Sequence, residues 1–73
     1  MINDNCINKR FVTRCGYFGV VIGKEALHDH IYKAILTMPV GINEFRDRTL
    51  FYLENGHIMG ASAIYNIKEF IDE

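Results

Sequence analysis

The clearest structural signal in this chain is the stretch Leu50-Phe51-Tyr52-Leu53-Glu54-Asn55-Gly56-His57-Ile58-Met59-Gly60. Two runs of β-forming residues flank its Asn-Gly pair. A type I′ turn needs a positive φ at both central residues, and Asn-Gly is the pair that adopts this conformation most readily. The stretch therefore predicts a β-hairpin with a two-residue loop.

A two-residue loop would also fix which residues face each other across the hairpin. It sets Tyr52 opposite Met59 and Leu53 opposite Ile58, so that both faces of the hairpin are apolar. The two faces would carry, respectively, Phe51, Leu53 and Ile58, and Leu50, Tyr52, Met59 and Ala61. A small two-layer domain needs only one apolar face on its sheet. This pattern therefore indicates a second apolar surface that either another part of the chain or another protein buries.

The segment from Lys24 to Met38 predicts a helix. Glu25 and Asp29 lie near its start, where acidic residues complement the helix dipole. Pro39 would end the helix, since the residue before a proline avoids the α region. Five apolar residues follow the helical spacing i, i+4, i+7, i+8 and i+11, namely Leu27, Ile31, Ala34, Ile35 and Met38.

A short second helix is predicted at the end of the chain. Asn66 and Glu69 have the spacing of a capping box, and Ile67, Phe70 and Ile71 would face inward. Residues 10–22 favour one long bent strand, with a hairpin at Cys15-Gly16 as the alternative. Residues 1–8 are expected to be a flexible N-terminal arm, and residues 9–73 a single α+β domain with the order β-α-β-β-α. Its antiparallel sheet would carry the helices on one face.

Composition narrows the class of protein. The chain has 73 residues, 49% of them hydrophobic, and a formal net charge of −1 from 8 basic and 9 acidic residues. A chain of this size has only a marginal core of its own. It contains two cysteines, no signal-peptide pattern, and no apolar run long enough to span a bilayer. These features predict a cytoplasmic protein with reduced thiols.

No pattern of catalytic or metal-binding residues is evident. Each residue of a helix turns by about 100°, so His28 and His30, two residues apart, would point to different sides of the predicted helix and could not share a metal. No CxxC or HxxxH spacing occurs. Cys15 has no base placed beside it by the sequence, and Cys6 is expected to be the more exposed thiol on the arm. We therefore expect the chain to have no catalytic activity and to bind neither a metal nor a cofactor.

The surplus apolar surface predicts a protein-interaction module. Two helices can cover one face of the sheet, and the other would either be closed by the first strand or the arm, or bind another chain. The expected partners are a second copy of the chain and a larger host protein whose site it occludes, as small phage accessory or inhibitor proteins do. Partner-binding residues would be Leu50, Tyr52 and Met59 on the sheet, with His28 and Tyr32 on a helix ridge that equally fits the edge of the core.

The alternative is a small dimeric regulator that binds nucleic acid. Its basic residues would be Arg10, Arg14, Arg46 and Arg48. The net charge of −1 weighs against this class, because free nucleic-acid-binding domains are usually basic.

Overall fold

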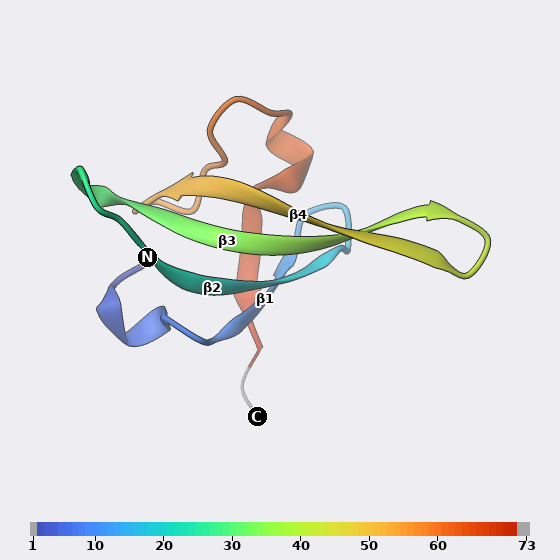
Figure 1. The fold of residues 1–73 in the computed structure, drawn as a ribbon, viewed down its shortest axis with the longest axis horizontal. Helices are drawn as coiled ribbons and strands as arrows, with labels where there is room; N and C mark the ends of the chain where they lie inside the picture. The colour runs from blue at the N-terminus through green and yellow to red at the C-terminus, as the bar shows by residue number, and fades with distance from the viewer. Residues whose placement is uncertain (1, 72–73) are drawn as a thin grey trace.

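The fold is an antiparallel β-sheet, and a computed structural model describes it for residues 2–71; residues 1, 72 and 73 lie outside the described part (Figure 1). The five strands run in the order β4-β3-β2-β1-β5. The elements are η1 Asp4–Cys6, β1 Arg10–Thr13, β2 Phe18–Glu25, β3 His28–Gly41, β4 Glu44–Leu53, η2 Ala63–Tyr65 and β5 Ile67–Phe70. Within residues 2–71 the only helical turns are the short 3-10 helices η1 and η2, so the predicted α+β class is wrong.

The sheet curls strongly around its core. In a flat sheet, Phe11 of β1 and Tyr52 of β4 would be at least about 14 Å apart, because three strand spacings separate their strands. They are also offset along the strands, since the row of Phe11 meets β4 at Arg48. Their ring centroids are instead 5.4 Å apart, in an edge-to-face arrangement. Figure 1 shows β5 crossing behind β2, β3 and β4. The curl lets one side of the sheet bury Phe11, Val21, Leu36, Tyr52 and Ile67 without any helix.

The predicted helix from Lys24 to Met38 is wrong because the same residues also satisfy the period of a strand. Tyr32, Ala34 and Leu36 alternate along β3 and are all buried. The intervening positions include β-branched Ile35 and Thr37, which favour strands. Pairing with β2 on one side and β4 on the other outweighs the helical spacing.

Pro39 does not end an element. It lies within β3, opposite Phe45 of β4, and beyond Thr37, which pairs with Phe18 at the start of β2. A proline is tolerated there, because a strand position without a partner on its second side has no ladder hydrogen bond to lose.

The turn at Asn55-Gly56 is present, but its register differs from the predicted one. The Gly56 N–H donates to the Leu53 carbonyl at 2.9 Å, and the Leu53 N–H donates to the His57 carbonyl at 2.9 Å. With Gly56 at φ 86°, this is a three-residue loop that ends in a left-handed glycine. Tyr52 therefore faces Ile58 through an isolated bridge. A slip of one residue exchanges the faces, so Ile58 joins the core and Met59 turns outward.

The predicted C-terminal helix is also absent, because residues Ile67–Phe70 form strand β5 against β1. Asn66 does not cap a helix. Its buried side chain accepts a hydrogen bond of 2.8 Å from the Ile58 N–H, and the Ile67 N–H donates to the Gly56 carbonyl at 2.9 Å. The local capping pattern is thus used to tie β5 to the end of β4.

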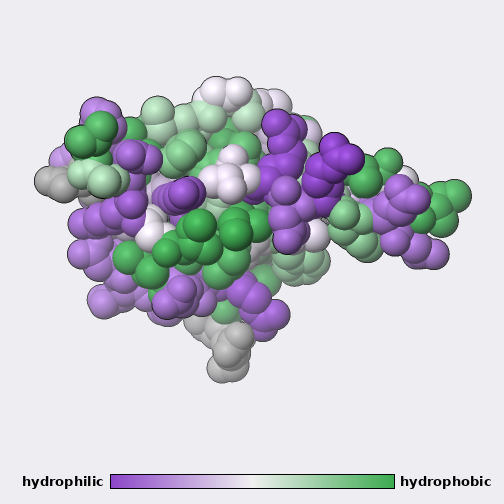
Figure 2. All heavy atoms as spheres, viewed as in Figure 1, coloured by the Kyte–Doolittle hydropathy of each residue, from purple (hydrophilic) through white to green (hydrophobic). Residues whose placement is uncertain are grey.

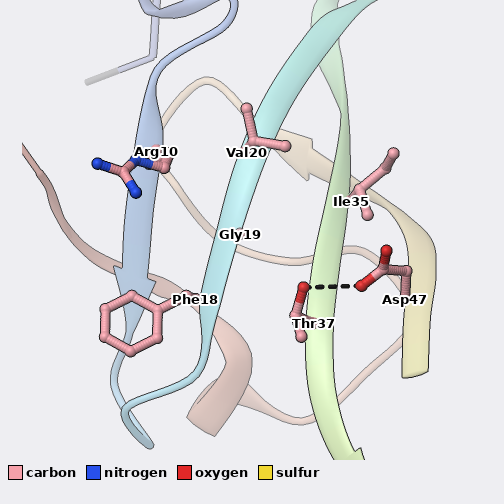
Figure 3. A pocket seen from close by; sticks show the side chains of 7 residues that line it. All are labelled: Arg10, Phe18, Gly19, Val20, Ile35, Thr37 and Asp47. Carbon is pink, nitrogen blue, oxygen red and sulfur yellow. Dashed lines mark hydrogen bonds between the residues drawn. The ribbon is translucent and has the colours of Figure 1, made fainter. Parts of the chain in front are cut away.

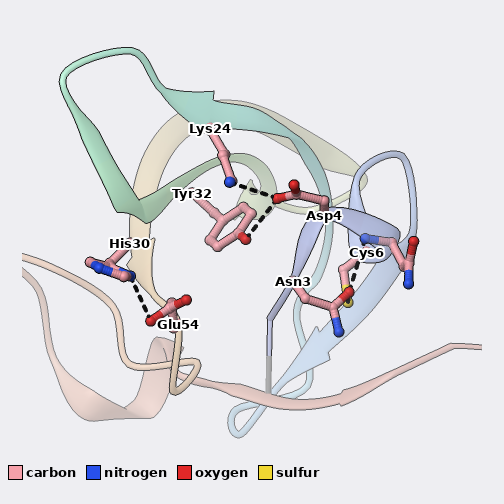
Figure 4. A network of polar contacts seen from close by, with 8 residues as sticks. Asn3, Asp4, Cys6, Lys24, His30, Tyr32 and Glu54 are labelled. Carbon is pink, nitrogen blue, oxygen red and sulfur yellow. Dashed lines mark hydrogen bonds and ion pairs between the residues drawn. The ribbon is translucent and has the colours of Figure 1, made fainter.

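Residues 2–8, where a flexible arm was predicted, contact the sheet. Ile2 is buried, and its N–H donates to the Glu54 carbonyl at 2.7 Å. The Asp4 carboxylate forms an ion pair of 2.9 Å with Lys24 and accepts a hydrogen bond of 3.1 Å from the Tyr32 hydroxyl (Figure 4). The expected thiol exposure is reversed as well, because Cys6 is buried on this segment and Cys15 is exposed.

The alternative reading of residues 10–22 is confirmed. Strands β1 and β2 are separate and joined by a turn at Cys15-Gly16, where Gly16 has φ 89°. Gly19 is required for a different reason: a Cβ at this position would lie 2.5 Å from Cζ of Phe11 and 2.8 Å from the Ile35 carbonyl oxygen. The absence of a side chain at Gly19 lets the Phe11 ring lie against β2.

Candidate protein-binding surfaces

The register separates the side chains of the sheet into two faces, because directly paired residues point the same way. The inner face includes the row Phe11, Gly19, Leu36 and Arg48. The outer face includes the row Arg10, Val20, Ile35 and Thr49 and, beside it, the row Val12, Phe18, Thr37 and Asp47. The inner face is closed by the curl of the sheet, whereas the outer face lies open.

A hollow of about 270 Å³ lies on the outer face over β2 and β3. Its floor is formed by Val20 and Ile35, both half-buried, and by Phe18, which is 59% exposed. Arg10 and Asp47 stand at its opposite sides (Figure 3). Asp47 is held in place by the Thr37 hydroxyl, which donates to its Oδ1 at 2.7 Å. The hollow is thus apolar in the middle and oppositely charged at its two rims.

A second hollow of about 350 Å³ lies at the other end of the outer face, and its apolar lining includes Phe51 and Met59. The remaining lining residues are Glu25, Leu27, His28 and Ile31. Leu27, in the turn between β2 and β3, is among the most exposed large apolar side chains of the described chain. Figure 2 shows this side of the molecule, with apolar side chains in a band over β2 and β3 and hydrophilic ones around it.

The β3–β4 hairpin projects beyond the rest of the sheet (Figure 1). Beyond the pair Phe18–Thr37, β3 and β4 are paired with each other and no longer with β2. The tip turns at Asn43, which has a left-handed φ of 57°. Three large apolar side chains here are open to water: Val40 is 54% exposed, Ile42 93% and Phe45 68%. The projecting end is therefore an apolar arm.

The residues predicted to form the interface do not lie together. Tyr52 is fully buried in the core, and its hydroxyl donates to the Tyr65 carbonyl at 2.8 Å. Burial also raises the pKa of Tyr52 above its usual value. Leu50 is half-buried and packs against the core, while Met59 is exposed on the opposite face. Tyr52 is thus a structural residue, and the predicted surface of Leu50, Tyr52 and Met59 is divided by the register of the hairpin.

The predicted ridge of His28 and Tyr32 is likewise absent. Tyr32 is buried, and burial together with the hydrogen bond to Asp4 raises the pKa of its hydroxyl. Leu36, which lies four residues after Tyr32 and would extend this ridge by one turn of the predicted helix, is fully buried. His28 is exposed and lines the second outer hollow. The interpretation that this row belongs to the core fits Tyr32 and Leu36.

The four arginines of the alternative reading point to different sides of the molecule. Arg10 lies on the outer face, in the row of Val20. Arg46 and Arg48 lie on the opposite face, because they pair with Met38 and with buried Leu36. Arg14 lies in the turn after β1 and lines a separate small hollow near Ile64. The fold does not gather them into one basic surface.

Among residues 2–71, no three His, Cys, Asp or Glu side chains come together in a way that could hold a metal ion. No helix in this part of the chain is long and apolar enough to cross a membrane. No family model, curated protein or solved structure matches the chain.

The exposed residues of the arm were missed by the sequence interpretation. Val40, Gly41 and Ile42 form a short apolar run after Pro39, where the predicted helix ended, and no strand or turn was predicted there. The usable signal was the combination of this run with Asn43, a residue that adopts a left-handed conformation more readily than most. Phe18 gave no signal, because its exposure depends on the pairing of β2 with β3.

Proposed function

We propose that this chain is a non-catalytic protein-interaction module that inserts its β3–β4 arm into an apolar groove of a larger protein and so occludes a site there. The observation that carries the proposal is the exposure of Val40, Ile42 and Phe45 on a part of the hairpin that projects from the sheet. Monomeric proteins seldom leave contiguous large apolar side chains in water unless they serve recognition.

The arm has the dimensions and chemistry of a binding element. A projecting two-stranded hairpin fits a cleft better than a flat surface, and its tip is tied down by the short turn at Asn43. Complete burial of an apolar side chain is worth roughly 1.5–3 kcal/mol, so removing the exposed parts of these three from water contributes roughly 3–6 kcal/mol before the costs of association. Glu44 and Arg46 lie beside the tip and can form polar contacts at the rim of such a groove.

The same exposure makes the proposal testable without loss of the fold. Ile42 is almost entirely in water, so Ile42→Asp is expected to leave the stability of the domain within about 0.5 kcal/mol of wild type. Leu27→Asp is the matched control, because it makes the same kind of change at an exposed turn at the other end of the sheet.

The experiment compares the wild-type chain with Ile42→Asp and Leu27→Asp. Each is immobilised, exposed to a lysate of the source cells, and the captured protein is identified and then purified for calorimetric titration. We expect wild type and Leu27→Asp to bind the target equally, and Ile42→Asp to bind it at least about tenfold more weakly. Equal affinity of all three chains for the target would refute the arm as the binding element.

A further inference from the structure

We infer that the outer face of the sheet is a self-complementary surface that binds a second copy of this chain, with a two-fold axis running along β2 and β3. This inference concerns a different surface from the arm and goes beyond the proposed function. It rests on the apolar hollow and on the opposite charges at its two rims.

The middle of the surface supplies the apolar contact. Phe18, Val20 and Ile35 lie side by side on neighbouring strands, with Val20 and Ile35 directly paired. Phe18 is more than half exposed, although it begins strand β2 and pairs with Val12 on one side and Thr37 on the other. A second sheet packed about 10 Å away would remove these side chains from water.

The rims supply the specificity. Arg10 on β1 and Asp47 on β4 stand on opposite sides of the hollow, one row apart along the strands (Figure 3). A two-fold axis parallel to β2 and β3 lays β1 of one copy over β4 of the other. Arg10 then lies over Thr49 of the second copy, one row from its Asp47, and the long Arg10 side chain spans that row of about 7 Å. The axis repeats this contact, so that two opposite-charge contacts form at once.

The same axis matches the apolar row to itself. It places β2 over β3 of the second copy, so Val20 meets Ile35 and Ile35 meets Val20 at the same level. The Thr37 hydroxyl holds Asp47 in position at the rim before any partner arrives.

Pairing through the free edge of β4 is a poorer route to the same dimer. The edge carries Arg46, Asp47 and Arg48 in succession. An antiparallel two-fold pairing centred on Asp47 would oppose two like charges on the axis and set Arg46 against Arg48. Charged residues on an edge strand are a common means of preventing such pairing.

The experiment is sedimentation equilibrium of the reduced protein, in which a thiol reductant excludes disulfides through exposed Cys15. We expect wild type to dimerise, and Arg10→Asp and Asp47→Arg each to weaken dimerisation by about tenfold or more, because each puts like charges in contact twice. An equimolar mixture of the two variants should form a heterodimer, since every rim contact in it is again opposite in charge. The double variant should likewise dimerise as wild type does.

Two control variants separate this inference from the proposed function. Arg48→Asp reverses a charge on the opposite face and should leave dimerisation unchanged, as should Ile42→Asp on the arm. A wild-type chain that stays monomeric at millimolar concentration would overturn the inference, as would single reversals without effect or a mixture that fails to associate. None of these outcomes changes the expected loss of target binding in Ile42→Asp.

Discussion

Tyr52 provides the sharpest test of the core. It is fully buried on β4, its ring meets Phe11 edge to face, and its hydroxyl donates to the Tyr65 carbonyl at 2.8 Å. Tyr52→Phe keeps the ring and removes the hydrogen bond, which is worth about 1 kcal/mol and up to about 2 because the half-buried Tyr65 carbonyl loses its donor. Tyr52→Ala also removes the ring and should cost about 3–5 kcal/mol.

These losses are large for a domain of this size. A chain of 73 residues has a free energy of unfolding of roughly 4–11 kcal/mol at about 0.05–0.15 kcal/mol per residue. Tyr52→Phe should therefore lower the midpoint of thermal unfolding by about 4–8 °C for each kcal/mol lost. Tyr52→Ala should remove at least about a quarter of the free energy of unfolding, and all of it if the wild-type value lies at the lower end of this range.

The assay is urea unfolding followed by circular dichroism, with Phe45→Ala as the matched control. Phe45 is an aromatic residue on the same strand but 68% exposed, so its truncation should change stability by less than about 0.5 kcal/mol. A loss below about 1 kcal/mol in Tyr52→Ala would refute the placement of this ring in the core. So would dissociation of a dimer by Tyr52→Ala with unchanged unfolding, since it would put Tyr52 at an interface.

Three further predictions concern pH and close packing. The pKa of Tyr52 is raised on folding, so the stability that this residue contributes is complete below the unfolded value of about 10 and is lost as the pH rises above it. Tyr52→Phe should flatten this alkaline loss of stability in urea titrations at a series of pH values. An equally steep loss in the variant would contradict the prediction. The pKa of Asp4 is lowered, chiefly by its hydrogen bond with Lys24, so the stability that Asp4 contributes is present above the unfolded pKa of about 4 and is lost as the pH falls. Asp4→Asn should remove this part of the loss of stability in acid. NMR titration of the Asp4 carboxyl is the check. Gly19→Ala should cost about 1–3 kcal/mol because its Cβ meets Phe11, whereas Gly23→Ala meets nothing within 4 Å and should leave unfolding by urea unchanged or slightly stabilised; equal effects of the two substitutions would contradict the close approach.

Local signals in the sequence located the turn at Asn55-Gly56 but not its register. Asn55-Gly56 marks a turn because glycine adopts a positive φ without strain, and that requirement is met by Gly56 alone. Whether the loop holds two or three residues depends on Asn66 and Ile67, which bind the far side of the turn from elsewhere in the chain. That choice decided which of Ile58 and Met59 is buried, and so it decided the composition of both faces.

Periodicity over residues 24–38 could not distinguish a helix from a strand. Apolar residues at Ile31, Ala34 and Ile35 satisfy the helical spacing, while Tyr32, Ala34 and Leu36 satisfy the alternation of a strand. Backbone pairing with β2 and β4 settles the ambiguity, and those partners are not encoded within the segment. The sequence alone determines three features: the excess of apolar residues, the β-forming runs and the glycines at turns. They follow from composition and from local backbone preferences. Which of these residues face water was set by the curl of the sheet, because only long-range pairing brings Phe11 against Tyr52 and leaves Phe18, Ile42 and Phe45 outside.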